Sequence, residues 1–317
     1  MHAGLLAEQP EVDGVLLSDI DAPRAREVAA SLGLEDAAID EVFGKVDAVV
    51  IAAATSAHAE LIGRAARAGI PAFCEKPIAV DVPSTEAVIR EVEQAGTVLQ
   101  VGFQRRFDAG YRAAHDLVAE GALGTLYVVR MAGHDPAPPP TEYIAVSGGI
   151  FRDFSIHDFD ALRFVTGREI VEVYADGSVI EFPVFEEHGD VNTAVATLRL
   201  EGGALAILSV TRHDPLGYDV RMEVFGSGDS VSVGWDDRMP LRSVEPGMPA
   251  APARPYGQFQ ERFAAAYRAE MTAFIDVVAG RRENPCTPED ALAALRVAVA
   301  CDVSRAEHRP VRLREVA

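Results

Sequence analysis

The sequence predicts an α/β protein of two domains, the first built on a parallel sheet and the second on an open, mostly antiparallel sheet. In the first third of the chain, short apolar runs alternate with amphipathic stretches, as in a parallel sheet covered by helices on both faces. Closely spaced strand-like runs follow between residues 170 and 225, which is typical of antiparallel pairing. The length of 317 residues also exceeds what one compact core usually holds.

The first domain, residues 1–102, is predicted to alternate strands and helices. We expect strands at residues 15–19, 48–52, 71–74 and 98–101, because each run is short, apolar and bounded by turn residues. Helices are expected between them at residues 24–32, 57–68 and 84–95. Buried strands linked by helices in this way form half of a doubly wound nucleotide-binding sheet.

The second domain, residues 103–317, is predicted to be α+β. A Pro-rich loop at residues 136–140 separates its first helix and strand from the rest, because prolines cannot continue a strand ladder. The expected helices are residues 111–120, 153–165, 258–279 and 288–305, and the expected strands are residues 126–130, 170–179, 193–200, 204–211 and 220–225. We expect residues 239–257 to form a surface loop and Thr287 to cap the last helix. A C-terminal helix is also expected to be able to pack back on the first domain.

The composition argues against nucleic acid and membranes as partners. With 29 Lys and Arg against 49 Asp and Glu, the net charge of −20 repels phosphodiester backbones and anionic lipids, although such a charge also serves simply for solubility. No apolar run approaches the roughly 20 residues that span a bilayer, and no signal peptide is recognisable at the start. The three scattered cysteines form neither a disulfide framework nor a metal-binding pair. We therefore expect a cytoplasmic protein without a metal.

Asp19 is the first candidate for a cofactor contact. It ends the run at residues 15–19, where a dinucleotide-binding fold places an acid that bonds the adenosine ribose 2′-hydroxyl and repels a 2′-phosphate. This position favours NAD over NADP. The alternative is a capping or turn role, which is common for Asp at the end of a strand.

Glu75 and Lys76 follow the strand at residues 71–74 directly. Open α/β sheets bind ligands at the carboxyl ends of their parallel strands, so this charged pair lies where a ligand is expected. The alternative is a surface loop with Pro77 as a turn residue.

Residues 153–160 place two acids around a histidine. At helical spacing Asp153, His157 and Asp160 share one face, while the buried stripe lies on another and comprises Ile156, Phe159 and Leu162. Asp153 can then orient His157 and favour its protonated form, as a base that takes a proton from an alcohol requires. The alternative is a structural ion pair without catalytic function.

Short motifs run in order along nearly the whole chain, at residues 66–69, 72–77, 101–107, 148–149, 153–160, 261–263 and 267–270. Together they resemble the Gfo/Idh/MocA oxidoreductase family, and within it the inositol 2-dehydrogenases. An ordered series of motifs is far more specific than any one of them.

The resemblance implies a role for each matched residue. Lys76 would reach the reacting hydroxyl and the nicotinamide ribose, so it would bind the cofactor as well as act in catalysis. Asp153 and His157 would contact the substrate, with His157 as acid and base. Glu75 and Gln104 would lie along the cofactor cleft, and the loop that contains Ala54, Thr55 and His58 would pass beside the dinucleotide, although His58 itself suits a helix-start or packing role. The weaker substrate-binding candidates are Arg106, His134 and Tyr218, and packing is the alternative for Tyr218.

One departure from the family pattern concerns the start of the chain. Family members begin with a strand and a glycine-rich loop that holds the pyrophosphate, and residues 1–6 resemble the helix that follows this loop. The parallel sheet is therefore expected to lack its first strand. We expect the strand and the loop to be encoded upstream of Met1.

These patterns together predict an NAD-dependent dehydrogenase of a cyclic polyol or sugar such as myo-inositol. His157 would take the hydroxyl proton and Lys76 would polarise the same oxygen. We also expect a homotetramer, because an open sheet leaves an apolar face that must be covered. The alternatives are a dehydrogenase of a different sugar and a non-catalytic, sugar-binding or regulatory relative that has lost the dinucleotide site.

Overall fold

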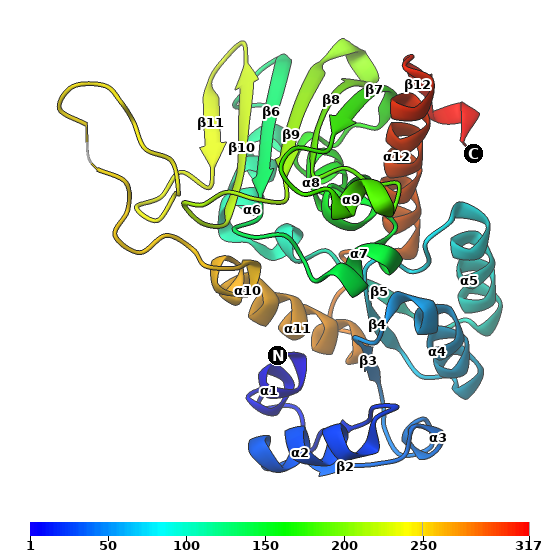
Figure 1. Cartoon of the computed structure of the whole chain (residues 1–317). Coiled ribbons are helices and arrows are strands. Elements are labelled where there is room, and N and C mark those ends of the chain that lie inside the picture. Colours follow the sequence, from blue (N-terminus) through cyan, green and yellow to red (C-terminus); the bar gives the residue numbers. More distant parts are fainter. Residues whose placement is uncertain (249, 317) are drawn as a thin grey trace. The chain divides into compact units, whose positions relative to one another are not determined.

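A computed structural model describes residues 1–248 and 250–316 of the chain. It divides the chain into two compact units (Figure 1). Unit 1 comprises Met1–Phe107 and Ala265–Leu292, and unit 2 comprises Asp108–Ala264 and Ala293–Ala317. The assignment of residues 1–102 and 103–317 as functional domains stays a prediction.

The parallel strands of unit 1 form two sheets. In one, β1 (Leu16–Leu17) pairs with β2 (Glu35–Asp36), and in the other β4 (Ala72–Glu75) lies between β3 (Val49–Ile51) and β5 (Leu99–Gly102). No ladder joins β1 to β3 among the described residues. The parallel sheet predicted from the sequence is confirmed, in two parts.

Helices cover both faces of the β3–β4–β5 sheet (Figure 1). One face carries α4 (Thr55–Ala68) and α5 (Val82–Ala95). On the other, Phe73 packs against Met271 and Phe274 of α11 (Ala264–Val278) and against Leu5 and Leu6 of α1 (His2–Ala7). The other elements of unit 1 are α2 (Ala22–Leu32), α3 (Ile39–Val42) and the 3-10 turn η1 (Gln104–Phe107).

The local sequence explains where these helices begin and end. Asp21 and Asp81 accept hydrogen bonds from the backbone N–H groups of Arg24 and Ser84, so each satisfies a helix N-terminus. Gly69 ends α4 in the left-handed conformation, with φ of 72°, where a side chain would be strained.

The strand expected at residues 48–52 was predicted to be buried, and this holds for Ile51 but not for the two residues before it. Val49 and Val50 are only half-buried, because β3 pairs with β4 on one edge alone in the described residues. The run at residues 15–19 likewise shortens to two paired residues. Both differences follow from the missing ladder between β1 and β3.

Unit 2 contains a seven-stranded sheet in the order β11-β10-β6-β9-β8-β7-β12 (Figure 1). All pairs are antiparallel except β6 with β9, which confirms the mostly antiparallel sheet. The strands are β6 (Leu126–His134), β7 (Ile170–Ser178), β8 (Thr193–Leu200), β9 (Leu205–Thr211), β10 (Asp219–Gly226), β11 (Ser230–Val233) and β12 (Val311–Arg312).

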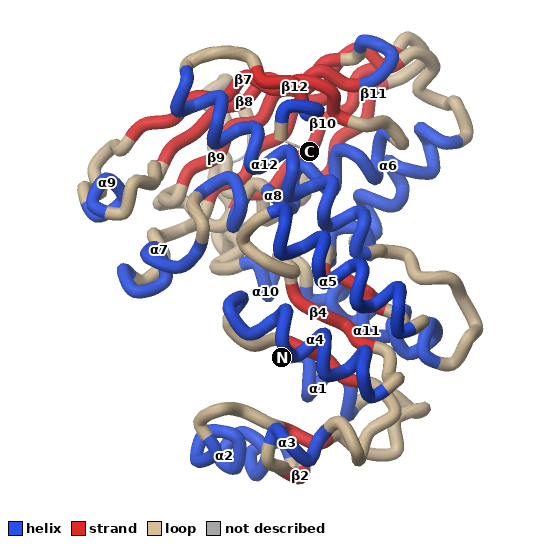
Figure 2. Tube along the Cα trace, turned by 90° about the vertical axis from the view of Figure 1, so that its right-hand side faces the viewer, coloured by secondary structure: helices blue, strands red, loops and turns tan. Residues whose placement is uncertain are grey.

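Helices α6 (Ala109–Ala119), α8 (Ile156–Thr166) and α12 (Pro288–Glu307) lie on one face of this sheet (Figure 2). Side chains on that face are buried, whereas Tyr174, Val195, Leu205 and Ile207 are 40–51% exposed on the opposite face. The remaining elements are α7 (Thr141–Ser147), the π-helical turn η2 (Ile150–Phe154), α9 (Val184–Glu187), α10 (Phe259–Arg262) and the 3-10 turns η3 (Glu201–Gly203) and η4 (Leu313–Glu315).

The helix expected at residues 153–165 differs from the sequence prediction. The chain forms η2 first and then α8, and the acids in the first turns of α8 are not solvated, because Asp158 and Asp160 are 0% exposed. The cause is that α8 packs against α6 as well as against β6. The helix expected at residues 258–279 is likewise interrupted at Phe263, between α10 and α11.

Candidate active site

Glu75 and Lys76 stand at the carboxyl end of β4, as the sequence predicts. The Nε2 atom of His2 lies 2.7 Å from Oε1 of Glu75. The His2 ring, which is 8% exposed, also packs near the rings of Phe73 and Tyr267, at 5.5 and 5.8 Å. His2 therefore orients the Glu75 carboxylate, a contact that the sequence analysis missed.

Gly102 approaches the same carboxylate from β5. A Cβ atom at this position would lie 2.9 Å from Oε2 of Glu75 and 3.0 Å from Cζ of Phe73. Only glycine fits such an approach without displacing a neighbour. The ends of β4 and β5 are thus fitted closely to each other.

Several residues at this end of unit 1 fit a bound dinucleotide. Gln104 is 3% exposed, and its Oε1 atom is buried without a hydrogen-bond partner among the described residues. Such an acceptor requires a donor, which the amide or ribose hydroxyls of a dinucleotide can supply. Ala54 and Thr55 lie at the N-terminus of α4, where helix backbone favours anionic groups.

The side chain of His58 is buried and links two loops through hydrogen bonds. It is 1% exposed, and its Nδ1 and Nε2 atoms lie 2.7 Å and 3.0 Å from the carbonyl oxygens of Pro77 and Ala53. Because a carbonyl only accepts, a neutral imidazole donates to one of them at a time. This geometry matches the packing alternative for the His58 side chain, and cofactor contact at this loop stays a prediction.

Asp19 follows β1, and its carboxylate has protein partners. Its Oδ1 atom accepts a hydrogen bond from the backbone of Asp21, and its Oδ2 atom accepts from Nε and Nη2 of Arg24 at 3.0 and 2.6 Å. The hydrogen bond from the backbone of Asp21 is the main cause that lowers the pKa of Asp19; burial opposes it, and the two contacts of Arg24 add to the lowering. The acid is ionised, as rejection of a 2′-phosphate requires, and it also has the turn contact that the alternative predicted.

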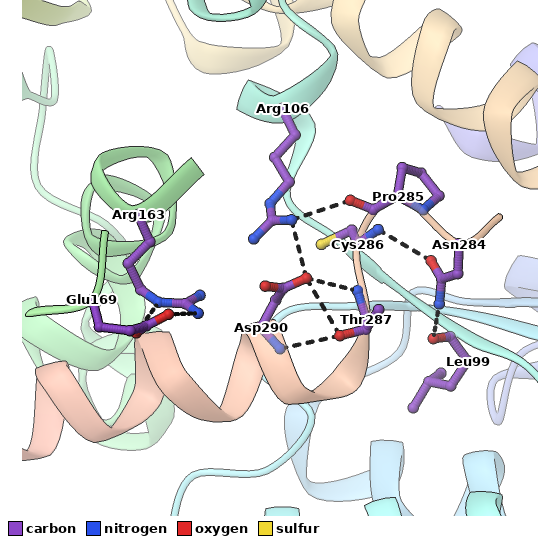
Figure 3. A network of polar contacts seen from close by, with 9 residues as sticks. All are labelled: Leu99, Arg106, Arg163, Glu169, Asn284, Pro285, Cys286, Thr287 and Asp290. Atoms are coloured by element: carbon purple, nitrogen blue, oxygen red, sulfur yellow. Dashed lines mark hydrogen bonds and ion pairs between the residues drawn. The ribbon is translucent and has the colours of Figure 1, made fainter. Parts of the chain in front are cut away.

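Arg106 is buried in a polar network within unit 1 (Figure 3). Its Nη1 atom donates to the carbonyl oxygen of Pro285 at 3.1 Å and pairs with Asp290 at 3.0 Å. Asp290 and Thr287 cap each other at the start of α12, which confirms Thr287 as the cap. Substrate binding by Arg106 stays a prediction.

In unit 2, η2 positions Asp153. The Asp153 Oδ1 atom accepts a hydrogen bond from the Tyr143 hydroxyl at 2.7 Å, and Oδ2 accepts from Nη2 of Arg212 at 2.7 Å. The start of η2 is fixed by Asp190, which accepts from the backbone N–H of Ile150 at 3.0 Å. Irregular π-helical turns of this kind often occur at functional sites.

His157 lies in the first turn of α8, four residues after Asp153, and is half-buried. A spacing of four along helical backbone directs two side chains to the same side of a helix. Both candidate residues therefore belong to one helical segment of unit 2. The pairing of Asp153 with His157 stays a prediction.

His134 ends β6, and its protonation can be derived from its contacts. The Thr211 hydroxyl donates to the carbonyl oxygen of His213, so it must accept from Nδ1 of His134 at 2.8 Å. Burial lowers the pKa of His134, against smaller opposing effects of Asp219 and Asp214. The ring is therefore neutral near pH 7, with its proton on Nδ1 and an acceptor at Nε2.

Tyr218 is 5% exposed, and its ring meets that of Phe263 edge to face at 6.4 Å. This contact matches the packing alternative that the sequence left open. A substrate contact by Tyr218 stays a prediction.

Membrane spans and metal clusters are both absent from the described residues. No helix there is long and apolar enough to cross a membrane. No group of three or more His, Cys, Asp or Glu side chains in the same residues could hold a metal ion.

Comparison with known proteins decides the family. Residues 1–103 match the oxidoreductase family with an NAD-binding Rossmann fold, and residues 111–232 match the Gfo/Idh/MocA C-terminal domain. The chain belongs to the Gfo/Idh/MocA oxidoreductase family. The resemblance derived from the motifs, the fold class and the NAD-binding first domain are thereby confirmed.

Individual family members match nearly the whole chain. The myo-inositol 2-dehydrogenase of Thermotoga maritima is 38% identical over 305 residues, which cover 95% of this chain and 91% of that protein. The crystal structure of a probable dehydrogenase from the same organism has a TM-score of 0.93 at 36% identity, covering 100% of this chain and 96% of that one. Scyllo-inositol dehydrogenase from Lactobacillus casei, solved with NAD(H) and scyllo-inositol, has a TM-score of 0.87 at 28% identity and coverage of 99% and 95%.

Proposed function

We propose that this protein oxidises a secondary ring alcohol of a cyclic polyol of the myo-inositol type, with NAD as the hydride acceptor. The observation that carries the proposal is that this member of an oxidoreductase family has three residues suited to proton transfer, Lys76, Asp153 and His157. Lys76 follows β4 in the NAD-binding domain, and Asp153 and His157 lie on one helical segment of unit 2. Relatives named as inositol dehydrogenases support the substrate class.

In this proposal the protein supplies position and proton transfer. His157 takes the proton of the reacting hydroxyl, and Asp153 stabilises the imidazolium that forms. Lys76 polarises the same oxygen as the alcohol becomes a ketone. NAD accepts the hydride from the ring carbon, so the two electrons and the hydrogen of the C–H bond leave together.

The contacts proposed for the cofactor lie in unit 1. Asp19 would bond the ribose hydroxyls, Glu75 and Gln104 would lie along the dinucleotide, and the loop of Ala54, Thr55 and His58 would pass beside it. Support comes from the ionised state of Asp19 and the unpaired acceptor on Gln104. These features suit NAD, and the charge on Asp19 opposes the phosphate of NADP.

The substrate contacts proposed are Arg106, His134 and Tyr218. A polyol presents hydroxyl groups that both donate and accept, and the neutral His134 ring offers Nε2 as an acceptor. Arg106 offers donors. Such opposite hydrogen-bonding characters would select the orientation of neighbouring hydroxyls on a ring.

We also propose that the protein forms a homotetramer through the open face of the unit 2 sheet. On this face Val195, Leu205 and Ile207 are 44–51% exposed on adjacent strands. Contiguous apolar surface of this kind is usually covered by another subunit, and closed symmetric assemblies are the common solution.

A substrate panel tests the proposed function. The purified protein is incubated with NAD and, in separate reactions, myo-inositol, scyllo-inositol and glucose, and NADH formation is followed by its absorbance. Turnover of either inositol well above that of glucose supports the proposal. Preference for glucose would identify a dehydrogenase of a different sugar. Binding of a polyol in calorimetry without any NADH formation would instead support the non-catalytic alternative.

A further inference from the structure

Arg212 is a buried cation that none of the proposed catalytic steps uses. It follows β9, is 3% exposed, and donates from Nη2 to Asp153 at 2.7 Å and from Nη1 to Asp135 at 3.1 Å. Its guanidinium also lies 5.0 Å from the centre of the Phe154 ring. A charge so far from water persists only when it is paired, and both partners here are carboxylates.

The charge state of Arg212 follows from these partners. Burial acts to lower its pKa, but Asp153 and then Asp135 outweigh burial and raise the pKa above the ordinary value. The guanidinium is therefore always charged. One cation can neutralise only one of two ionised carboxylates, so an ionised Asp153 and Asp135 around Arg212 would leave the cluster anionic.

Asp153 is held by donors on both of its oxygen atoms. Arg212 approaches Oδ2, and the Tyr143 hydroxyl approaches Oδ1 from α7 at 2.7 Å. Two segments of unit 2, α7 and the residues after β9, thus converge on one carboxylate of η2. Two donors from different directions fix the plane of a carboxylate, which a single contact would not do.

We propose that Arg212 is a positioning residue, which holds the Asp153 carboxylate ionised and in one orientation beside His157. The proposal rests on the proposed function, because Asp153 and His157 are the proton-transfer pair of that function. Arg212 itself has no direct contact with substrate or cofactor in this role. It acts by separating the like charges of Asp135 and Asp153 and by fixing the orientation of the Asp153 carboxylate.

Removal of Arg212 should therefore damage catalysis through Asp153. Without the shared cation, two neighbouring carboxylates repel, and one of them takes up a proton at neutral pH. Arg212→Gln should lower kcat by about 10-fold to 100-fold, within the usual value of one positioned acid-base interaction. The acid limb of kcat/KM should move to higher pH by about one unit or more, since the carboxylate then needs a higher pH to ionise.

A double-mutant cycle separates positioning from general stability. If Arg212 acts through Asp153, Arg212→Gln should change kcat by less than about threefold in the Asp153→Asn background. Arg212→Lys keeps the charge but loses the planar guanidinium that donates to two partners, so its kcat should lie between those of Arg212→Gln and the wild type. Tyr143→Phe removes a single hydrogen bond at a side chain that is 44% exposed, and should lower kcat by a smaller factor without loss of folding.

Arg163→Gln is the matched control. Arg163 lies on α8, the helix that carries His157, and its ion pair with Glu169, at 2.6 to 2.8 Å, is likewise lost on substitution (Figure 3). The control should keep kcat within about twofold and leave the pH profile unchanged. The proposal would be overturned if the Arg212→Gln protein folds and keeps both wild-type kcat and the position of the acid limb. It would also be overturned if the losses of kcat from Arg212→Gln and Asp153→Asn multiply in the double mutant.

Thermal unfolding of the same variants gives a readout that does not depend on activity. Arg212→Gln should lower Tm by more than about 5 °C in the wild-type background and by clearly less in the Asp153→Asn background. If the wild-type protein oxidises no polyol but the Tm coupling between Arg212 and Asp153 is observed, the proposed function is contradicted and the contact between the two residues is still supported. Equal Tm losses in both backgrounds would instead show that Arg212 and Asp153 are not coupled, and would overturn the positioning role.

Discussion

Substitution of Gly102 tests how closely β4 and β5 are fitted at the candidate cofactor site. In Gly102→Ala the new Cβ atom would lie 2.9 Å from Oε2 of Glu75 and 3.0 Å from Cζ of Phe73. Ordinary contacts between such atoms are about 3.5–4.0 Å, so Oε2 of Glu75 must move by about half an ångström or more and the Phe73 ring by at least a few tenths. Phe73 cannot move freely, since it is 0% exposed and packs against Met271 and Phe274.

The cost of Gly102→Ala follows from these two contacts. Insertion of one extra carbon into a packed interior costs about 1–3 kcal/mol of unfolding free energy. In a protein of this size that corresponds to a fall in Tm of about 2–5 °C. Displacement of Glu75 would also break its 2.7 Å contact with His2 and weaken binding of NADH, which fluorescence titration measures.

Two further variants make the test specific. Gly14→Ala is the control, because no atom lies within 4 Å of the place that its new Cβ would occupy and its backbone is not left-handed, so Tm should change by less than about 2 °C. In the Glu75→Ala background, the additional effect of Gly102→Ala should fall by roughly half, since one of its two clashes is gone. A Gly102→Ala protein with wild-type Tm and NADH affinity would refute the close fit.

Three other predictions concern the cofactor, pH and assembly. Asp19→Ser should raise KM for NAD and relax the rejection of NADP in steady-state kinetics, and unchanged constants for both cofactors would exclude the proposed ribose contact. Because the pKa of His134 is lowered on folding, the unfolded chain binds its proton more tightly, so stability present above pH 6.5 is lost as the pH falls below that value. His134→Gln should flatten this part of the stability profile in denaturant titrations, and an unchanged slope would contradict the assignment. Ile207→Asp on the open sheet face, where Ile207 is 45% exposed, should dissociate the tetramer in light scattering, and a wild-type monomer would contradict the assembly.

Local patterns were sufficient to predict the elements that hold the candidate catalytic residues. Apolar runs and turn residues located β4 with Glu75 and Lys76 at its end, and helical spacing located Asp153 and His157. Each of these predictions depends on residues within one or two turns of chain. The Thr287 cap belongs to the same class, because its partner Asp290 is three residues away.

Contacts between distant segments could not be predicted in this way. Arg212 lies 59 residues from Asp153, and His2 lies 73 residues from Glu75, so no spacing in the sequence connects either pair. The burial of Asp158 and Asp160 depends on α6, which packs against α8 from an earlier part of the chain. Periodicity alone treats such acids as solvated, because it contains no information about a second covering element.

Turnover by His157→Ala tests the central claim most directly. NADH formation from the best inositol substrate should fall by roughly 100-fold to 10,000-fold, with NAD binding intact and partial recovery at high pH, where hydroxide replaces the base. Lys76→Ala should cause a comparable loss, and the double mutant should lose much less than the product of the two factors, because both groups serve one proton transfer. If His157→Ala keeps near wild-type turnover on the substrate that the parent oxidises, His157 is not the base, and the Asp153–His157 pair has only a structural role.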